Sequence, residues 1–130
     1  MTLELAWSAG FFDGEGSICV SNIKRHKSHS GKYYPCVSVQ MSLTQVFPEP
    51  LHRFVDATGL GAVRGPYQPK NKNHRPYYKW QISGRGLCIK AIRMLWPFLS
   101  PPKKDQITRV WDELRDRRTP KSPFLPDLPT

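Results

Sequence analysis

Apolar residues occupy every side of the helix that the start of the chain predicts. Thr2 is a suitable N-cap, and we expect the helix to run to about Phe12 and to end at Gly14 and Gly16. A helix that is apolar all round is buried on all sides. In so short a chain, one side of this helix can face the protein's own core while another side faces a partner molecule.

The chain then alternates between strand-like and helix-like patterns up to residue 118. Apolar and polar residues alternate, as in strands with one buried face, over residues 17–25, 34–43, 61–67 and 77–83. Helices are expected over residues 49–58, which Gly59 closes, and over residues 87–99 and 103–118, which Pro101 and Pro102 separate. The predicted fold class is α+β, with helices covering one face of an antiparallel sheet.

The alternation also assigns side chains to the two faces of this sheet. Apolar residues such as Val39, Met41 and Trp80 should face the helices. The opposite face should be open to solvent and should carry these residues: Ser21, Arg25, Ser38, Gln40, Ser42, Arg64, Tyr77, Lys79 and Gln81. A polar and basic sheet surface is a candidate platform for nucleic acid.

Charge strengthens this interpretation. The 130 residues allow one domain, and 20 Lys and Arg against 10 Asp and Glu give a net charge of +10. No carboxylate occurs over residues 16–48 or 57–104. Such segments attract polyanions, of which nucleic acid is the commonest in cells. Basic residues in or beside the loops between paired strands are expected to contact phosphates: Lys24, Lys27, Lys70, Lys72 and Arg75.

The cysteine and histidine residues do not indicate a disulfide framework or a metal site. Cys19, Cys36 and Cys88 are an odd number without CxxC spacing, so neither a disulfide framework nor a zinc site is indicated. His26 and His29 lie in a Lys, Ser and Gly-rich loop without a second ligand pair, which favours a solvated loop.

The two ends of the chain complete the expected organisation. The apolar N-terminal stretch is far shorter than the ~20 residues that a bilayer requires, and it lacks a basic leader. We therefore expect a soluble, intracellular protein with no membrane partner. A domain over residues 1–118 should be followed by an extended tail over residues 119–130, where proline recurs every third residue.

One segment carries the candidate chemistry. SAGFFDGEG, residues 8–16, resembles the LAGLIDADG motif of homing endonucleases position for position. The Ala-Gly pair, the two phenylalanines, the acids Asp13 and Glu15 and the last glycine all match. LWPFL at residues 95–99 and KKDQ at residues 103–106 resemble the family's segment that supplies a catalytic lysine. The resemblance is to the single-motif members and covers residues 3–118.

The resemblance implies the αββαββα homing-endonuclease fold, in which the antiparallel sheet forms a saddle that holds double-stranded DNA. Two motif helices, one per subunit, pack together along the axis of a homodimer. Ala6, Gly10 and Gly14 recur every four residues, and such a stripe lets two helix backbones approach closely. The interface is expected to contain Ala6, Ala9, Gly10 and Asp13.

The resemblance also implies a divalent metal where the two motif helices end, beneath the DNA minor groove. Mg²⁺ takes oxygen ligands, and paired metals stabilise the attacking and leaving oxygens of a phosphate. Glu15 is the expected ligand, with the Gly14 carbonyl beside it, while Asp13 caps or orients local backbone. Mn²⁺ is expected to replace Mg²⁺, and Ca²⁺ to support binding without cleavage. Glu15 stands where the family more often has Asp, which lengthens the arm by one methylene.

Two further residues are implied for catalysis. Lys103 should orient the water network near the scissile phosphate, and Lys104 is the alternative because Pro101 and Pro102 leave the register open. Gln45 at the end of the second strand, or else Gln40, should complete the site.

The expected function is a site-specific homing endonuclease that makes a metal-dependent double-strand break in a long, near-palindromic DNA target. The alternative is a non-cleaving relative that acts as an intron-RNA maturase or as a DNA-binding regulator on the same sheet. The carboxylate at Glu15 favours the enzyme.

Overall fold

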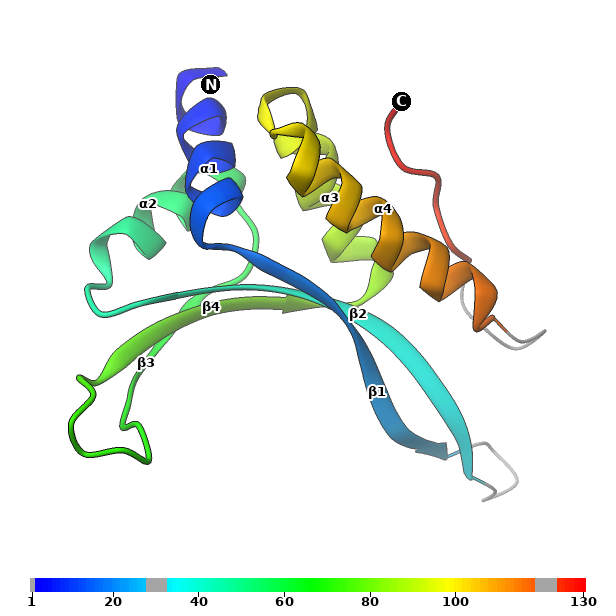
Figure 1. Cartoon of the computed structure of the whole chain (residues 1–130), viewed down its shortest axis with the longest axis horizontal. Coiled ribbons are helices and arrows are strands. Elements are labelled where there is room, and N and C mark those ends of the chain that lie inside the picture. The colour runs from blue at the N-terminus through cyan, green and yellow to red at the C-terminus, as the bar shows by residue number, and fades with distance from the viewer. Residues whose placement is uncertain (1, 28–32, 119–123) are drawn as a thin grey trace.

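Four antiparallel strands form one curved sheet, and the helices lie on one side of it (Figure 1). The computed structural model describes residues 2–27, 33–118 and 124–130, and within them the side chains outside residues 22–36. The elements are α1 (Thr2–Glu15), β1 (Ser17–Lys27), β2 (Tyr33–Gln45), α2 (Glu49–Thr58), β3 (Val63–Tyr67), β4 (Tyr77–Ser83), α3 (Arg85–Leu95), the short 3₁₀ helix η1 (Trp96–Phe98) and α4 (Pro101–Asp116). The predicted α+β fold class is confirmed.

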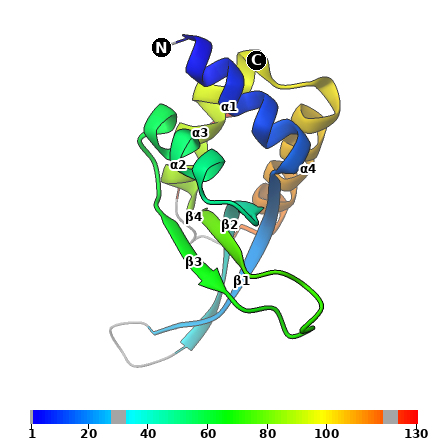
Figure 2. The same ribbon diagram turned by 90° about the vertical axis from the view of Figure 1, so that its left-hand side faces the viewer.

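The two hairpins meet in the middle of the sheet, whose strand order is β1-β2-β4-β3. Ser42 of β2 lies opposite Ser17 of β1 on one side and opposite Gln81 of β4 on the other. Three polar residues therefore stand in one row across three strands. The strands arch so that the face away from the helices is concave, and Figure 2 shows the same surface from the side.

The other face of the sheet packs against the helices, as the alternation predicts. Val39, Met41 and Trp80 are fully buried. The Trp80 ring meets Phe54 of α2 edge to face at a centroid distance of 4.6 Å, and its indole N–H donates to the Leu60 carbonyl at 2.8 Å. Burial removes a large apolar surface from water, and the hydrogen bond satisfies the polar group.

The end of α1 differs from the sequence expectation. Gly14 does not end the helix, which continues to Glu15, and the Gly16 N–H donates to the Phe12 carbonyl at 2.8 Å. A glycine is tolerated near the end of a helix because the loss of backbone freedom costs only about 1 kcal/mol. The second acid of the motif therefore belongs to the last helical turn.

The start of α4 also differs. Pro101 and Pro102 form its first turn instead of standing between two helices. Proline is tolerated there because the first N–H groups of a helix have no intrahelical acceptor. The preceding helix α3 ends at Leu95, and residues 96–98 continue as η1.

The described end of the C-terminal segment lies against α4. Leu125 is 6% exposed and joins the core, and the Trp111 indole N–H donates to the Pro126 carbonyl at 2.6 Å. Residues 124–130, the described part of the expected tail, therefore pack against the domain.

Candidate active site and nucleic-acid interface

The C-terminal end of α1 brings Glu15 to the junction between helix and sheet (Figure 1). Glu15 and Gly14 are both exposed there. Gly16 makes the turn into β1, and a Cβ at this position would overlap the Phe12 ring. Only glycine fits, because Phe12 is held in the core. The turn therefore presents the Glu15 carboxylate to solvent at a fixed point of the fold.

The amine of Lys103 reaches the same junction from α4. Its Nζ donates to the Gly16 carbonyl at 2.9 Å and to Gln106 Oε1 at 3.0 Å. It also lies 5.5 Å from the centre of the Phe12 ring, whose face attracts cations. The amine of the half-buried Lys103 is thus held at the carbonyl of Gly16, the residue that follows Glu15.

Lys104 points elsewhere. Its Nζ lies 5.4 Å from the centre of the Trp96 ring in η1. Between the two lysines that the sequence left open, the structure brings Lys103 to the acidic end of α1. Gln106, the second acceptor of the Lys103 amine, was not predicted, although it lies at the helical i+3 spacing that brings side chains together.

Asp13 has a different task from Glu15. Its Oδ1 accepts hydrogen bonds from the Ser100 backbone N–H at 3.0 Å and from the Ser100 hydroxyl at 2.7 Å. Asp13 was expected to cap or orient local backbone, whereas the backbone that it binds is 87 residues away, at the start of α4. The carboxylate is therefore bound within its own subunit, and the placement of Asp13 at a dimer interface stays a prediction.

The two candidate glutamines lie on opposite faces of β2. Gln40 is on the polar face, where its Oε1 accepts a hydrogen bond from the Gln81 side chain at 3.4 Å. Gln45 pairs with Tyr78 and has the parity of the buried residues Met41 and Leu43. It is half-buried, at the last position of the strand.

One side of α1 faces open space. Leu3 is 84% exposed, and Cβ atoms added at Gly10 and Gly14 would meet nothing within 4 Å. Ala6 is partly exposed along the same side. Ala9 was expected at this interface but is fully buried in the subunit's own core, together with Ser8 and Phe12 of the same helix. The exposed stripe is therefore Leu3, Ala6, Gly10 and Gly14.

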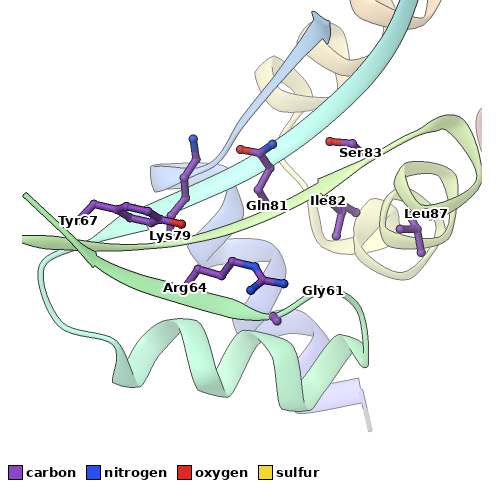
Figure 3. Close-up of a pocket in the computed structure, with 9 residues that line it drawn as sticks. Gly61, Arg64, Tyr67, Lys79, Gln81, Ile82, Ser83 and Leu87 are labelled. Atoms are coloured by element: carbon purple, nitrogen blue, oxygen red, sulfur yellow. The ribbon is translucent and has the colours of Figure 1, made fainter. Parts of the chain in front are cut away.

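The concave face of the sheet carries the predicted polar side chains. Arg64 of β3 lies opposite Lys79 of β4, and both line an open pocket of about 410 Å³ at this edge of the sheet. Figure 3 shows Lys79 and Gln81 on one side of β4 and Ile82 on the other. The pocket places two cations and an amide within reach of one ligand.

The remaining predicted contacts divide into three groups. Tyr77, Ser21 and Ser42 are half-buried on the concave face, while Ser38 is 9% exposed and is thus buried, not open to solvent as expected. Alternation gives the face of a small side chain but not its depth between larger neighbours. The second group, Lys70, Lys72 and Arg75, is exposed in the loop between β3 and β4. The side chains of Lys24, Arg25 and Lys27, and those of His26 and Cys36, lie outside the described residues, as does His29.

Two kinds of feature are absent from the described part of the chain. No three His, Cys, Asp or Glu side chains come together there as a metal-binding group. No helix in it is both long and apolar enough to cross a membrane.

Solved structures of homing endonucleases share this fold, although no protein-family model and no curated protein matches the sequence. Homing endonuclease I-CvuI, in complex with the I-CreI target in the presence of magnesium, gives a TM-score of 0.65 at 23% identity over 87% of this chain and 66% of that chain. The intron-encoded I-CeuI, complexed with DNA, gives 0.61 at 18% identity over 88% and 55%. The LAGLIDADG homing endonuclease I-SmaMI, bound to cleaved DNA, gives 0.61 at 20% identity over 86% and 35%.

These likenesses concern the fold. The chain spans less than two thirds of each of these three structures, between 35% and 66% of their lengths. The fold that the motif implied is confirmed: it is the fold of the LAGLIDADG homing endonucleases.

Proposed function

We propose that the chain is a site-specific DNA endonuclease of the LAGLIDADG type. It acts as a homodimer and makes a double-strand break in a long, near-palindromic duplex. The observation that carries the proposal is the end of α1, where exposed Glu15 precedes the carbonyl that holds the Lys103 amine. An acid that can bind a metal and a fixed cation that can face a phosphate are both components of phosphodiester hydrolysis.

Glu15 and the Gly14 carbonyl are the groups that would hold a divalent metal. Both residues are exposed, and a carboxylate and a carbonyl offer the oxygen ligands that Mg²⁺ prefers. One chain supplies too few carboxylates, so the second copy would contribute its own motif acid. The bound ion would act as a Lewis acid on the phosphate and activate a water. Mn²⁺ should substitute for Mg²⁺, and Ca²⁺ should support DNA binding without cutting.

The Lys103 amine is arranged to act on the phosphate and its water network. Two of its three N–H donors are used by the Gly16 carbonyl and Gln106. We assign the third donor to the substrate. Gln45 at the end of β2 is assigned to the same water network.

The second copy would pack on the exposed stripe of α1. Glycine at positions 10 and 14 lets two helix backbones approach, and Leu3 would be covered at the rim of the contact. A symmetric contact of this kind uses the same patch on both subunits. It would also bring the two Glu15 residues together at the dimer axis.

DNA would occupy the concave face. Arg64, Lys79 and Gln81 carry the groups that read guanine and adenine edges in the major groove. Exposed Lys70, Lys72 and Arg75 would contact phosphates, which set position without reading bases.

Cleavage of a randomised duplex library tests this function directly. The protein is incubated with the library in Mg²⁺, Mn²⁺ or Ca²⁺, and the ends produced are sequenced. We expect one family of near-palindromic sites, cut on both strands with short 3′ overhangs in Mg²⁺ and uncut but bound in Ca²⁺. Binding without cutting in Mg²⁺ and Mn²⁺ would point to a regulator, and promotion of intron-RNA splicing to a maturase.

Lys103→Ala and Lys104→Ala form a matched pair for the assigned lysine. Lys103→Ala should lower the cleavage rate much more than the DNA affinity, because a misplaced water affects the transition state more than the removal of one phosphate interaction affects a large interface. Lys104→Ala should leave the rate near that of the wild type. Equal decreases of rate and affinity in Lys103→Ala would make it a phosphate-binding residue only.

A further inference from the structure

The two acids of the motif are only two residues apart, yet Asp13 does not face the same way as Glu15. Oδ1 of Asp13 accepts both donors of Ser100, at 3.0 Å from the backbone N–H and 2.7 Å from the hydroxyl. These residues are 87 positions apart in the sequence. The contact therefore ties the last turn of α1 to Ser100, the residue that precedes α4.

Ser100 is the N-cap residue of α4, and its geometry shows that it is held from outside the helix. Its hydroxyl makes no capping bond to its own helix, which is the usual use of a serine at this position. Pro101 and Pro102 follow and have no N–H groups to be capped, and the first helical bond runs from the Lys104 N–H to the Ser100 carbonyl at 3.0 Å. The negative charge of Asp13 at this helix N-terminus also complements the helix dipole.

Lys103 is the third residue of the helix that begins in this way. Its Nζ returns to the chain at the Gly16 carbonyl, 2.9 Å away. Two connections therefore bracket Glu15 along the chain, Asp13 to Ser100 before it and Gly16 to Lys103 after it. The first connection fixes the backbone from which the second one extends.

We propose that Asp13, acting through Ser100, is the positioning residue that places the Lys103 amine beside Glu15. The proposal rests on the proposed function for its catalytic consequence, but its geometric part concerns this chain alone. Asp13 itself touches no substrate in this arrangement. A displacement of the start of α4 would move the lysine while leaving Glu15 in place.

The geometric part can be measured without DNA by methylation of lysines with formaldehyde and a reducing agent, followed by mass spectrometry. Lys104 is the internal reference, because it belongs to the same helical turn but lies against Trp96. We expect Lys103 to react more slowly than Lys104 in the wild type, and Ser100→Ala to bring the two rates several-fold closer. Ser100→Thr keeps the hydroxyl and should behave as the wild type. Thr108→Ala removes another hydroxyl bond of α4, to the Lys104 carbonyl, and should have no effect on the ratio.

The catalytic part is tested by single-turnover cleavage of saturating target DNA in Mg²⁺. Ser100→Ala keeps the backbone N–H bond to Asp13, so we expect a rate loss of ~10-fold, below the ~100-fold that a displacement of 1 Å can cause. Asp13→Ala removes both bonds and should cost more than Ser100→Ala. DNA affinity should be unchanged in both, and Ser100→Thr should restore the rate.

The decisive comparison is made in the Lys103→Ala background. If Asp13 and Ser100 act through the lysine, Ser100→Ala causes no further rate loss there. An equal loss in both backgrounds, or an unchanged labelling ratio in Ser100→Ala, would overturn the proposal. If the wild type cuts no DNA but Ser100→Ala still changes the ratio of the Lys103 and Lys104 labelling rates as expected, the proposed function is refuted. The positioning of Lys103 is then still supported.

Discussion

The core-facing side and the open side of α1 are built from different residues. On the core-facing side, Ala9 and Phe12 are fully buried. On the open side, Leu3 is 84% exposed and a Cβ at Gly10 would meet nothing within 4 Å. Packing within the subunit explains the size of the core-facing residues. It does not explain the small residue on the open side, because a larger side chain at Gly10 would fit and would be a better helix former.

The same contrast recurs across the sheet. Trp80 and Ile82 of β4 are buried against the helices, whereas Gln81 between them is exposed on the concave face. Polar residues on an exposed face are ordinary, but here they include the facing cations Arg64 and Lys79 with no acid among their strand neighbours. The core-facing sides thus specify the fold, and the open sides are where we propose that two partners bind: a second copy on α1 and DNA on the sheet.

The largest effect should come from the acid on the open side at the end of α1. Glu15→Gln removes the charge that would bind metal while nearly preserving shape, so we expect cleavage to fall by roughly 1,000-fold or more, the upper range for loss of one stabilising group in an active site. DNA binding and the free energy of unfolding should stay unchanged. The measurement is single-turnover cleavage in Mg²⁺, with Asp56→Asn, an exposed acid of α2, as the control. Normal cleavage by Glu15→Gln would rule out this assignment.

The two sides of α1 should respond in opposite ways to substitution. Phe12→Ala opens a cavity on the core-facing side and should lower the free energy of unfolding by ~3–5 kcal/mol. Gly10→Leu adds bulk on the open side and should leave the folded subunit intact. It should instead weaken the dimer by ~1–3 kcal/mol in each subunit, because overpacking acts twice in a symmetric contact.

Chemical denaturation and sedimentation measure these two effects separately. Denaturation is followed at several protein concentrations, because the stability of a dimer depends on concentration. Sedimentation should show a dimer for the wild type and a monomer for Gly10→Leu. A wild type that is monomeric at micromolar concentration while cutting DNA at full rate would contradict the assignment of the open side.

The core-facing sides are also the part that the sequence predicts best. Alternation placed Val39, Met41 and Trp80 against the helices because a half-buried strand repeats every two residues. The predicted ends of helices were less accurate. The pattern around Gly14 and Pro101 does not show whether a glycine or proline lies inside the end of a helix or beyond it. Depth was also missed at Ser38, since its burial depends on neighbours from other strands.

Only the part of the site that lies within one short sequence motif could be predicted from the sequence. Glu15 follows from the motif, and the choice between Lys103 and Lys104 required the fold. Ser100 had no signal in the sequence, because its partner Asp13 is 87 positions away and only the fold brings the end of α1 to the start of α4.

Variants on the open side of the sheet and in its loop should distinguish residues that read bases from residues that bind phosphates. Substituting Arg64, Lys79 and Gln81 together should change the preferred bases at matching positions of both half-sites, at ~1–3 kcal/mol for each good contact. Lys70→Ala and Lys72→Ala should weaken binding about equally for all sequences and lower the salt dependence by about one unit for each phosphate that the protein no longer neutralises. Target preference is profiled on a randomised duplex library. An unchanged preference in the triple variant would remove the concave face from recognition.

The smallest effect should be seen at two cysteines on opposite sides of the sheet. Cys19 of β1 lies opposite Gln40 and is exposed, while Cys88 of α3 is buried beneath β2. Burial raises the pKa of the Cys88 thiol to about 12, so almost none of it is the reactive thiolate at pH 8.

Iodoacetamide at pH 8 should therefore alkylate Cys19 and leave Cys88 unmodified, as read by mass spectrometry in a Cys36→Ser background. Above the pKa of Cys88, or after unfolding, both thiols should react. Saturating target DNA in Ca²⁺ should slow the alkylation of Cys19 several-fold, because a duplex on the concave face would cover it. Heparin, which competes for phosphate-binding groups, should reverse that protection. If Cys19 reacts at the same rate with and without bound DNA, the duplex does not cover the part of the face that β1 and β2 form.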